Sequence, residues 1–239
     1  MNKRLKQLGY VSLLTLLCVL LAACGSKPES STKPSPSPSP VQGGAAPSAI
    51  TPTPSPSAAA TPKKWSAPPA MTIDTKKTYE ATFDTNKGSF KVQLFADTAP
   101  QTVNNFIFLS KEGFYNNVTF HRIMKTFMIQ TGDPLGTGSG GPGYNIPDEL
   151  KSPHKYDPGI VAMANTGQPN SGGSQFFICT GADCAGLNSM PNYTIFGKVS
   201  EGMDIVQKIA GTAVKASSRG EMSVPTETVK INSISVKEK

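Results

Sequence analysis

The sequence predicts a mainly-β domain, a closed barrel of many short strands with two helices over its ends, that follows a long segment unable to fold. Short apolar runs bounded by turn residues recur from residue 79 to residue 236, and only two stretches have helical spacing. Twelve of the 21 prolines lie between Pro28 and Pro69, largely in Ser-Pro and Thr-Pro repeats that a packed domain cannot use. The folded domain is therefore expected to span residues 71–239.

The first strands form a predicted β-hairpin. Residues Tyr79–Asp84 and Phe90–Leu94 alternate apolar and polar side chains, which indicates strands with one buried face. The short segment between them contains Asn86, Lys87 and Gly88, which suit a tight turn.

A helix is expected next. Asp97 or Thr98 can cap its start, and Pro100 suits its first turn. Gly113 is expected to end it, and one side is apolar, formed by Val103, Phe106, Ile107 and Leu109. A second helix of about ten residues is expected around Met203–Ile209, and the remaining strands around Phe120–Gln130, Ile160–Ala164, Gln175–Thr180, Thr194–Val199 and Val229–Val236.

The N-terminus has the pattern of an export signal over residues 1–23. A short basic start precedes an apolar run, Leu8–Leu21, which is shorter than the ~20 residues that a membrane-spanning helix needs. The sequence Leu21-Ala22-Ala23-Cys24 that follows resembles a bacterial lipobox, which implies that Cys24 is lipidated and becomes the mature N-terminus. The protein is then expected to sit, lipid-anchored, on the extracytoplasmic face of the membrane. An ordinary cleaved signal peptide is the alternative.

Residues 24–70 are expected to be a disordered tether. They are rich in Ser, Thr, Ala, Gly and Pro and contain almost no large apolar side chain, so burial cannot offset the entropy of ordering them. Their proline content favours an extended polyproline II spacer. A ligand for proline-binding modules has the same composition and remains the alternative.

The net charge of +7 does not indicate a nucleic-acid-binding surface. Most of it lies in the leader and the tether, which leaves about +1 for the expected domain. Basic residues would have to gather on a folded face to bind nucleic acid, so that function is excluded.

One segment carries a specific motif. The run from Phe120 to Asp133, FHRIMKTFMIQTGD, resembles the signature of the cyclophilins. The blocks Met163-Ala164-Asn165, Ser174–Thr180 and Phe196–Val199 follow in that family's order and near its spacing. The resemblance covers about residues 78–236. It implies an eight-stranded antiparallel barrel capped by two α-helices, and peptidyl-prolyl cis–trans isomerisation without a metal or cofactor.

This reaction requires few catalytic groups from the protein. Rotation about an X-Pro bond has a barrier of about 18–20 kcal/mol, because the amide loses its resonance as it twists. The prolyl nitrogen regains a lone pair in the twisted state, so a fixed cationic donor beside it lowers the barrier. Arg122 matches this donor in the family motif, and its guanidinium stays charged at any relevant pH. His121 is expected to be structural, since isomerisation transfers no proton.

The resemblance also assigns the substrate-binding residues. Phe127, Met128, Phe177 and Leu187 match the proline pocket, although composition alone favours core positions for them. The polar side chains that match those which bind the substrate backbone and help to orient Arg122 are Gln130 and Gln175. Two further residues, Ala164 and Asn165, match an extended edge that contacts the residues before proline.

Several positions depart from the eukaryotic pattern. Gly186 aligns with a Trp that binds cyclosporin, so weak cyclosporin binding is expected. Tyr193 replaces a pocket His and can keep its ring contact and polar tip, and Thr131 replaces a usual Gly. Residues 188–192 are additional.

Other signals support no further activity. Residues 136–141 contain G-x-G-x-x-G, but Pro142 and Gly143 follow where a dinucleotide site needs a helix. Cys179 and Cys184 lack the partners for a zinc site and are expected either to form a disulfide or to remain two thiols.

The chain is expected to be monomeric. Two alternative functions fit the sequence. The first is a membrane-tethered isomerase that binds proline-containing polypeptides and helps exported proteins to fold, a process that X-Pro bonds delay by about 10–100 s. The second is a proline-peptide-binding or chaperone module in which catalysis is incidental.

Overall fold

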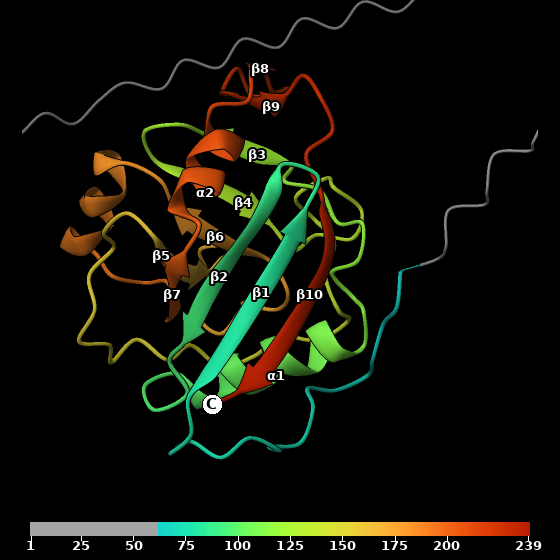
Figure 1. The fold of residues 1–239 in the computed structure, drawn as a ribbon, viewed down its shortest axis with the longest axis vertical. Helices are drawn as coiled ribbons and strands as arrows, with labels where there is room; N and C mark the ends of the chain where they lie inside the picture. Colours follow the sequence, from blue (N-terminus) through green and yellow to red (C-terminus); the bar gives the residue numbers. More distant parts are fainter. Residues whose placement is uncertain (1–61) are drawn as a thin grey trace, which may run out of the picture. The chain divides into compact units, whose positions relative to one another are not determined.

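The structure is a computed structural model that describes residues 62–239. The expected signal peptide, the lipidated Cys24 and most of the tether lie outside the described residues. Residues 62–239 form ten strands, two α-helices and one 3-10 helix (Figure 1), in the order β1 Tyr79–Thr85, β2 Gly88–Leu94, α1 Pro100–Lys111, β3 Arg122–Met124, β4 Met128–Thr131, β5 Ile160–Met163, β6 Phe176–Cys179, η1 Ala182–Ser189, β7 Ile195–Glu201, α2 Met203–Ala210, β8 Val214–Ala216, β9 Met222–Pro225 and β10 Ile231–Glu238.

Eight strands form one antiparallel sheet in the order β10-β1-β2-β7-β5-β6-β4-β3. The prediction of a closed barrel was wrong, because the edge strands β3 and β10 do not pair and the sheet is an open half-barrel. The segments that precede these strands meet only at an isolated bridge between Thr119 and Lys230. Strand β3 is three residues long, and β9 of the separate β8–β9 hairpin lies beside it.

The predicted first hairpin is confirmed. Strands β1 and β2 pair from Tyr79 opposite Leu94 to Thr85 opposite Gly88, with alternate side chains buried. The rings of Phe83 and Phe90 stack at 4.6 Å between centroids on the buried face. Alternation therefore set the face of each strand that enters the core.

Helix α1 begins at Pro100, as predicted, but its cap is different. Ala99 is the N-cap residue and makes no side-chain cap bond, so neither Asp97 nor Thr98 caps the helix. The carboxylate of Glu149 accepts the N–H groups of Gln101 and Thr102 instead, at 3.0 and 2.9 Å. A distant loop thus satisfies the first donors of the helix and adds a negative charge where the helix dipole favours it.

The sequence pattern predicts that the folded domain starts at residue 71, but packing against the domain begins earlier in the chain. The Trp65 ring lies 5.2 Å from the Phe108 ring and 5.9 Å from the Phe114 ring, and the backbone N–H of Trp65 donates to the Pro142 carbonyl at 2.8 Å. A side chain at Gly143 would meet the Trp65 carbonyl oxygen at 2.6 Å. The end of the expected tether is therefore built into the domain.

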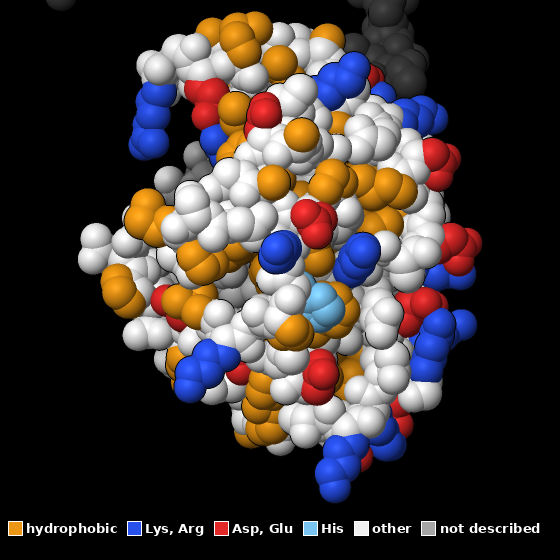
Figure 2. Space-filling view, turned by 90° about the vertical axis from the view of Figure 1, so that its left-hand side faces the viewer, with side chains coloured by type: hydrophobic (Ala, Val, Ile, Leu, Met, Phe, Trp, Pro, Cys, Tyr) orange, Lys and Arg blue, Asp and Glu red, His pale blue; other side chains and the backbone are white. Residues whose placement is uncertain are grey.

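The face of the molecule shown in Figure 2 mixes hydrophobic side chains with charges of both signs. In residues 62–239, no helix combines the length and the hydropathy needed to cross a membrane.

Candidate active site

The sheet brings three predicted site residues into one row. Arg122 on β3 lies opposite Gln130 on β4, and Gln130 lies opposite Phe177 on β6. Directly opposed residues project to the same face of a sheet about 4.5–5.5 Å apart. Their neighbours Ile123, Ile129 and Ile178 form the next row and project to the other face, into the main core. Because side chains alternate between the two faces along each strand, Arg122 lies outside the core and beside the pocket residues.

The predicted proline pocket forms a second hydrophobic cluster on this outer face. The cluster contains buried Met128 and Phe177, and partly buried side chains pack against it, namely Phe127, Ala164, Leu187 and Tyr193. The rings of Phe177 and Tyr193 meet edge to face at 5.4 Å. The hydroxyl of Tyr156 donates to the Tyr193 carbonyl at 2.6 Å and accepts its N–H at 3.1 Å, which fixes this end of the pocket.

Arg122 borders this pocket. Its Nη1 donates to the Sδ atom of Met128 at 3.8 Å, and its guanidinium carbon lies 6.0 Å from the centre of the Phe127 ring. The opposite edge of the fork holds Glu221, with Nε donating to Oε1 at 2.7 Å and Nη2 to Oε2 at 2.6 Å. This bidentate pair fixes the plane of the guanidinium with one edge toward the pocket.

A cleft of about 560 Å³ continues from the pocket, and Gln130, Gln175, Ala164 and Asn165 all line it. Gln130 donates to the Gln175 side chain at 3.0 Å, and Gln175 donates to the Gly140 carbonyl at 2.9 Å. This chain of amides spans the cleft wall, and within the described residues the structure records no bond from either glutamine to Arg122. The expected help in orienting Arg122 comes from Glu221 in this state.

Hydrogen bonds within the protein already occupy part of the edge that is expected to contact the residues before proline. The N–H of Ala164 donates to the Gln175 carbonyl at 2.9 Å, and the Asn165 amide donates to the Asn192 carbonyl at 2.8 Å. The Asn165 side chain therefore braces the additional loop 188–192. A peptide along this edge must pair with the remaining backbone groups.

Residues 138–143 of the glycine-rich segment line the cleft. Fully buried Asp133 accepts N–H bonds from Leu135, Thr137, Gly138 and Ser139 at 2.6 to 3.0 Å. A side chain at Gly140 would collide with this carboxylate. Glycine at this position is needed to bring the loop around Asp133.

Burial opposes the ionisation of Asp133, but the backbone N–H bonds outweigh it and hold the pKa of this carboxyl below its usual value. Asp133→Ala should lower the free energy of unfolding by about 2 kcal/mol at neutral pH, with Asp133→Asn intermediate. Because the folded-state pKa is depressed, this contribution is complete above the unfolded pKa of about 3.9 and is lost as pH falls through the folded value. Urea titrations at several pH values measure it, and equal stability of wild type and Asp133→Ala at pH 7 would contradict it.

His121 packs beneath the glycine-rich loop. Burial lowers the pKa of its imidazole, so the ring is neutral at pH 7, and its Nδ1 atom is buried without a hydrogen-bond partner. Its Nε2 atom lies 3.8 Å from the position of a Cβ on Gly138, beneath the glycine-rich wall. These contacts agree with the structural role expected for it.

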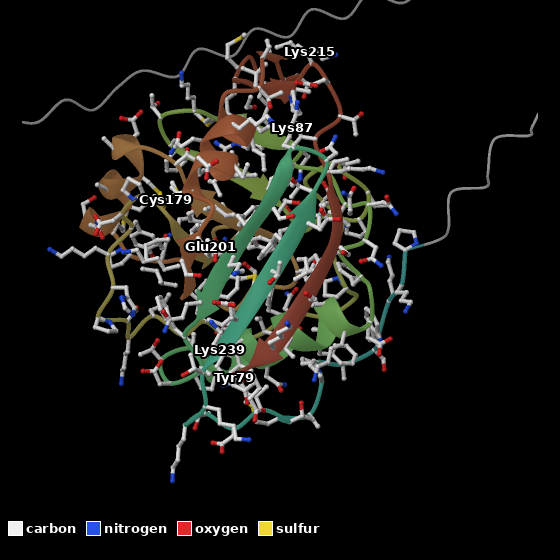
Figure 3. The ribbon with its side chains drawn as sticks, in the orientation of Figure 1. Tyr79, Lys87, Cys179, Glu201, Lys215 and Lys239 are labelled. Carbon is white, nitrogen blue, oxygen red and sulfur yellow. A yellow bond between two sulfur atoms is a disulfide. The ribbon has the colours of Figure 1, made fainter. Side chains whose placement is uncertain are left out.

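Cys179 and Cys184 form a disulfide, which settles the alternative that the sequence left open. The bond joins the end of β6, where Figure 3 labels Cys179, to η1, a helix that the sequence did not predict. η1 carries Leu187 to the pocket. The crosslink therefore supports one wall of the pocket.

Reduction of this disulfide, or Cys184→Ser, should lower the free energy of unfolding by about 2 kcal/mol, as expected for the entropy of closing so short a loop. Denaturant titrations with and without reductant measure the loss. Mass spectrometry of the alkylated protein checks the bond itself, and alkylation of both cysteines without reductant would contradict it.

Two residues of the site were missed from the sequence. Glu221 lies in a segment without a recognisable pattern, and its separation of 99 residues from Arg122 gave no local signal. Lys64 lines the cleft because its neighbour Trp65 packs against the domain core. A single Trp within the expected tether was the one sequence feature that could have indicated this packing. Among residues 62–239 no group of three or more His, Cys, Asp or Glu side chains is placed to hold a metal ion.

Comparison with known proteins identifies the family. The model of the family "Cyclophilin type peptidyl-prolyl cis-trans isomerase/CLD" matches residues 81–236. A peptidyl-prolyl cis-trans isomerase of Helicobacter pylori is 46% identical over 136 residues, covering 56% of this chain and 81% of the relative. A probable peptidyl-prolyl cis-trans isomerase A of Mycobacterium bovis is 41% identical over 185 residues, covering 70% and 97%.

Solved structures agree with this. A Cryptosporidium parvum cyclophilin-type isomerase superposes with a TM-score of 0.58 and 34% identity, over 68% of this chain and 99% of that one. Another crystal structure of that protein was obtained in the presence of the dipeptide Ala-Pro. The chain belongs to the cyclophilin-type peptidyl-prolyl cis-trans isomerases.

Proposed function

We propose that the chain is a lipid-anchored isomerase at the outer face of a bacterial membrane, with Arg122 as its catalytic donor, and that it accelerates X-Pro isomerisation in exported proteins. The observation that carries the catalytic part is the place of Arg122. Its Nη1 edge lies against Met128, at the border of the cluster that contains Phe127 and Phe177.

The geometry suits the twisting of an amide. The apolar cluster takes the proline ring, and the 560 Å³ cleft takes the residues before it. With the ring held, the N–H groups on Nη1 can donate to the prolyl nitrogen as its lone pair forms. The use of Ala-Pro with the Cryptosporidium parvum relative agrees with this class of substrate.

The anchor rests on sequence. Cys24 follows the apolar run of the leader, where a lipobox places the modified cysteine. An acyl chain contributes about 0.8 kcal/mol per buried methylene, and stable attachment takes more than one chain. A tether of polyproline character extends about 3.1 Å per residue, so residues 24–61 can hold the domain on the order of 100 Å from the lipid.

Labelling of expressing cells with radioactive palmitate tests the anchor. Wild-type protein should carry label and sediment with membranes, whereas Cys24→Ser should carry none and leave the membrane fraction. Cys184→Ser is the matched control and should keep the label. Unlabelled wild-type protein, or unchanged location of Cys24→Ser, would contradict the proposal.

The folding role requires a client whose refolding is limited by an X-Pro bond. A secreted protein of this kind should refold at least tenfold faster with catalytic amounts of the domain, because uncatalysed isomerisation takes about 10–100 s. A client that is held soluble without any acceleration would favour a binding module in place of the isomerase role.

A further inference from the structure

The pairing partner of Arg122 comes from outside the main sheet. Glu221 directly precedes β9 in the β8–β9 hairpin, which Figure 1 shows above β3, and Figure 3 labels Lys215 on the same hairpin. Its carboxylate meets the guanidinium with both oxygens, at 2.7 and 2.6 Å. Both side chains are about one-third exposed, at 32% and 36%. The pair thus lies at the rim of the pocket.

The pair leaves donors for a substrate. A guanidinium has five N–H donors, and the fork to Glu221 uses one on Nε and one on Nη2. Nη1 takes no part in the pair, and the structure directs it at Met128 Sδ, at the border of the pocket. Glu221 therefore fixes the plane of the fork without covering the edge that the reaction needs.

Glu221 is itself held in place. Its N–H donates to Ser217 Oγ at 3.2 Å, and its carbonyl accepts the N–H of Ser217 at 2.8 Å. The hydrogen bonds from Arg122 lower the pKa of its carboxyl to about 2, against a smaller effect of burial, with further help from Ser223 and the charge of Arg219. The carboxylate remains charged through the range in which an ordinary Glu titrates.

Among the described residues, Glu221 is the only carboxylate that forms an ion pair with Arg122. Gln130 and Gln175 bond each other rather than Arg122. We propose that Glu221 is a positioning residue for the isomerase reaction: it holds the Arg122 fork so that the Nη1 edge faces the prolyl nitrogen. The proposal rests on the proposed role of Arg122.

Glu221→Ala should lower kcat about tenfold, well within the ~100-fold that misplacement of a reacting group can cost, and leave KM within about twofold. Glu221→Gln keeps one acceptor oxygen, so its kcat should lie between those of Glu221→Ala and wild type. Glu227→Ala is the matched control, because Glu227 forms a comparable exposed pair with Lys87 at 2.8 Å at the other end of the hairpin. Its kcat should equal that of wild type, and thermal melts should show all variants folded.

A double-mutant cycle separates positioning from a structural effect. In an Arg122→Ala background, Glu221→Ala should lower kcat no further, because its effect passes through Arg122. Unchanged or raised kcat of Glu221→Ala in the wild-type background, or an equal fall in both backgrounds, overturns the proposal. Unchanged kcat of Arg122→Ala alone overturns the role of Arg122 instead, so the two failures are distinguishable.

The pH dependence gives an independent readout. In the folded protein the Glu221 carboxyl, held by the two hydrogen bonds from Arg122, takes up a proton only as pH falls toward its pKa of about 2. Wild-type kcat should therefore be level from about pH 7 to about pH 5, and it should not follow an ordinary Glu titration near 4.3 below that range. A fall with an apparent pKa near 4.3 that is absent in Glu221→Gln would overturn the charged clamp.

Discussion

Arg122→Ala should lower kcat/KM for an Ala-Pro peptide at least tenfold, and up to about 150-fold. The range follows from the ~1.5–3 kcal/mol of a charge-assisted hydrogen bond, converted at 1.36 kcal/mol per tenfold change in rate. Arg122→Lys keeps the charge but loses the guanidinium, which can contact Glu221 and the pocket at the same time. Its activity should therefore lie between those of Arg122→Ala and wild type. A protease-coupled cis/trans assay measures both variants.

The matched control is Lys125→Ala. Lys125 is an exposed cation in the turn between β3 and β4, and its backbone carbonyl, which accepts from Thr180 at 3.0 Å, stays in place after the substitution. Its activity should equal that of wild type. Arg122→Ala with wild-type turnover would remove Arg122 from the mechanism.

Gly186→Trp should tighten cyclosporin binding about 30-fold relative to wild type, for which the alignment predicts weak binding, because a buried aromatic anchor contributes about 2 kcal/mol or more to binding. A Cβ on Gly186 would meet no atom within 4 Å, and the next residue, Leu187, already packs against the pocket cluster. A Trp at this position therefore has room beside the pocket, as the alignment with a cyclosporin-binding Trp predicts.

Inhibition curves of isomerase activity measure this change. Ala182→Trp is the control, since Ala182 is an exposed residue at the other end of η1, and it should leave inhibition weak. Nanomolar inhibition of the wild-type protein would show that the alignment of Gly186, or the expected shape of the pocket, is wrong.

The parts of the fold that local sequence controls were predictable. Alternation in residues 79–94 set the first hairpin, and Pro100 marked the start of α1. The motif around Arg122 grouped the candidate pocket residues, and strand register explains why the structure brings several of them together. Arg122, Gln130 and Phe177 occupy opposed positions, so one alternating pattern places all three on the same face.

The parts that depend on long-range contacts were not predictable. The cap of α1 comes from Glu149, and the partner of Arg122 is Glu221, yet neither glutamate differs in local sequence from a solvated surface residue. Closure of the sheet depends on whether its edge strands are long enough to pair, and β3 has three residues. The 3-10 helix η1 has little apolar periodicity, since only Cys184 is buried in it.

Exchange NMR of an Ala-Pro peptide bound to the protein tests the central claim most directly, because it measures binding and on-enzyme isomerisation separately. Arg122→Ala should bind the peptide within about twofold of the wild-type Kd, since the apolar cluster remains, while its on-enzyme exchange rate falls at least tenfold. An unchanged exchange rate together with weakened binding would instead show that Arg122 only holds the substrate, and would contradict the claim.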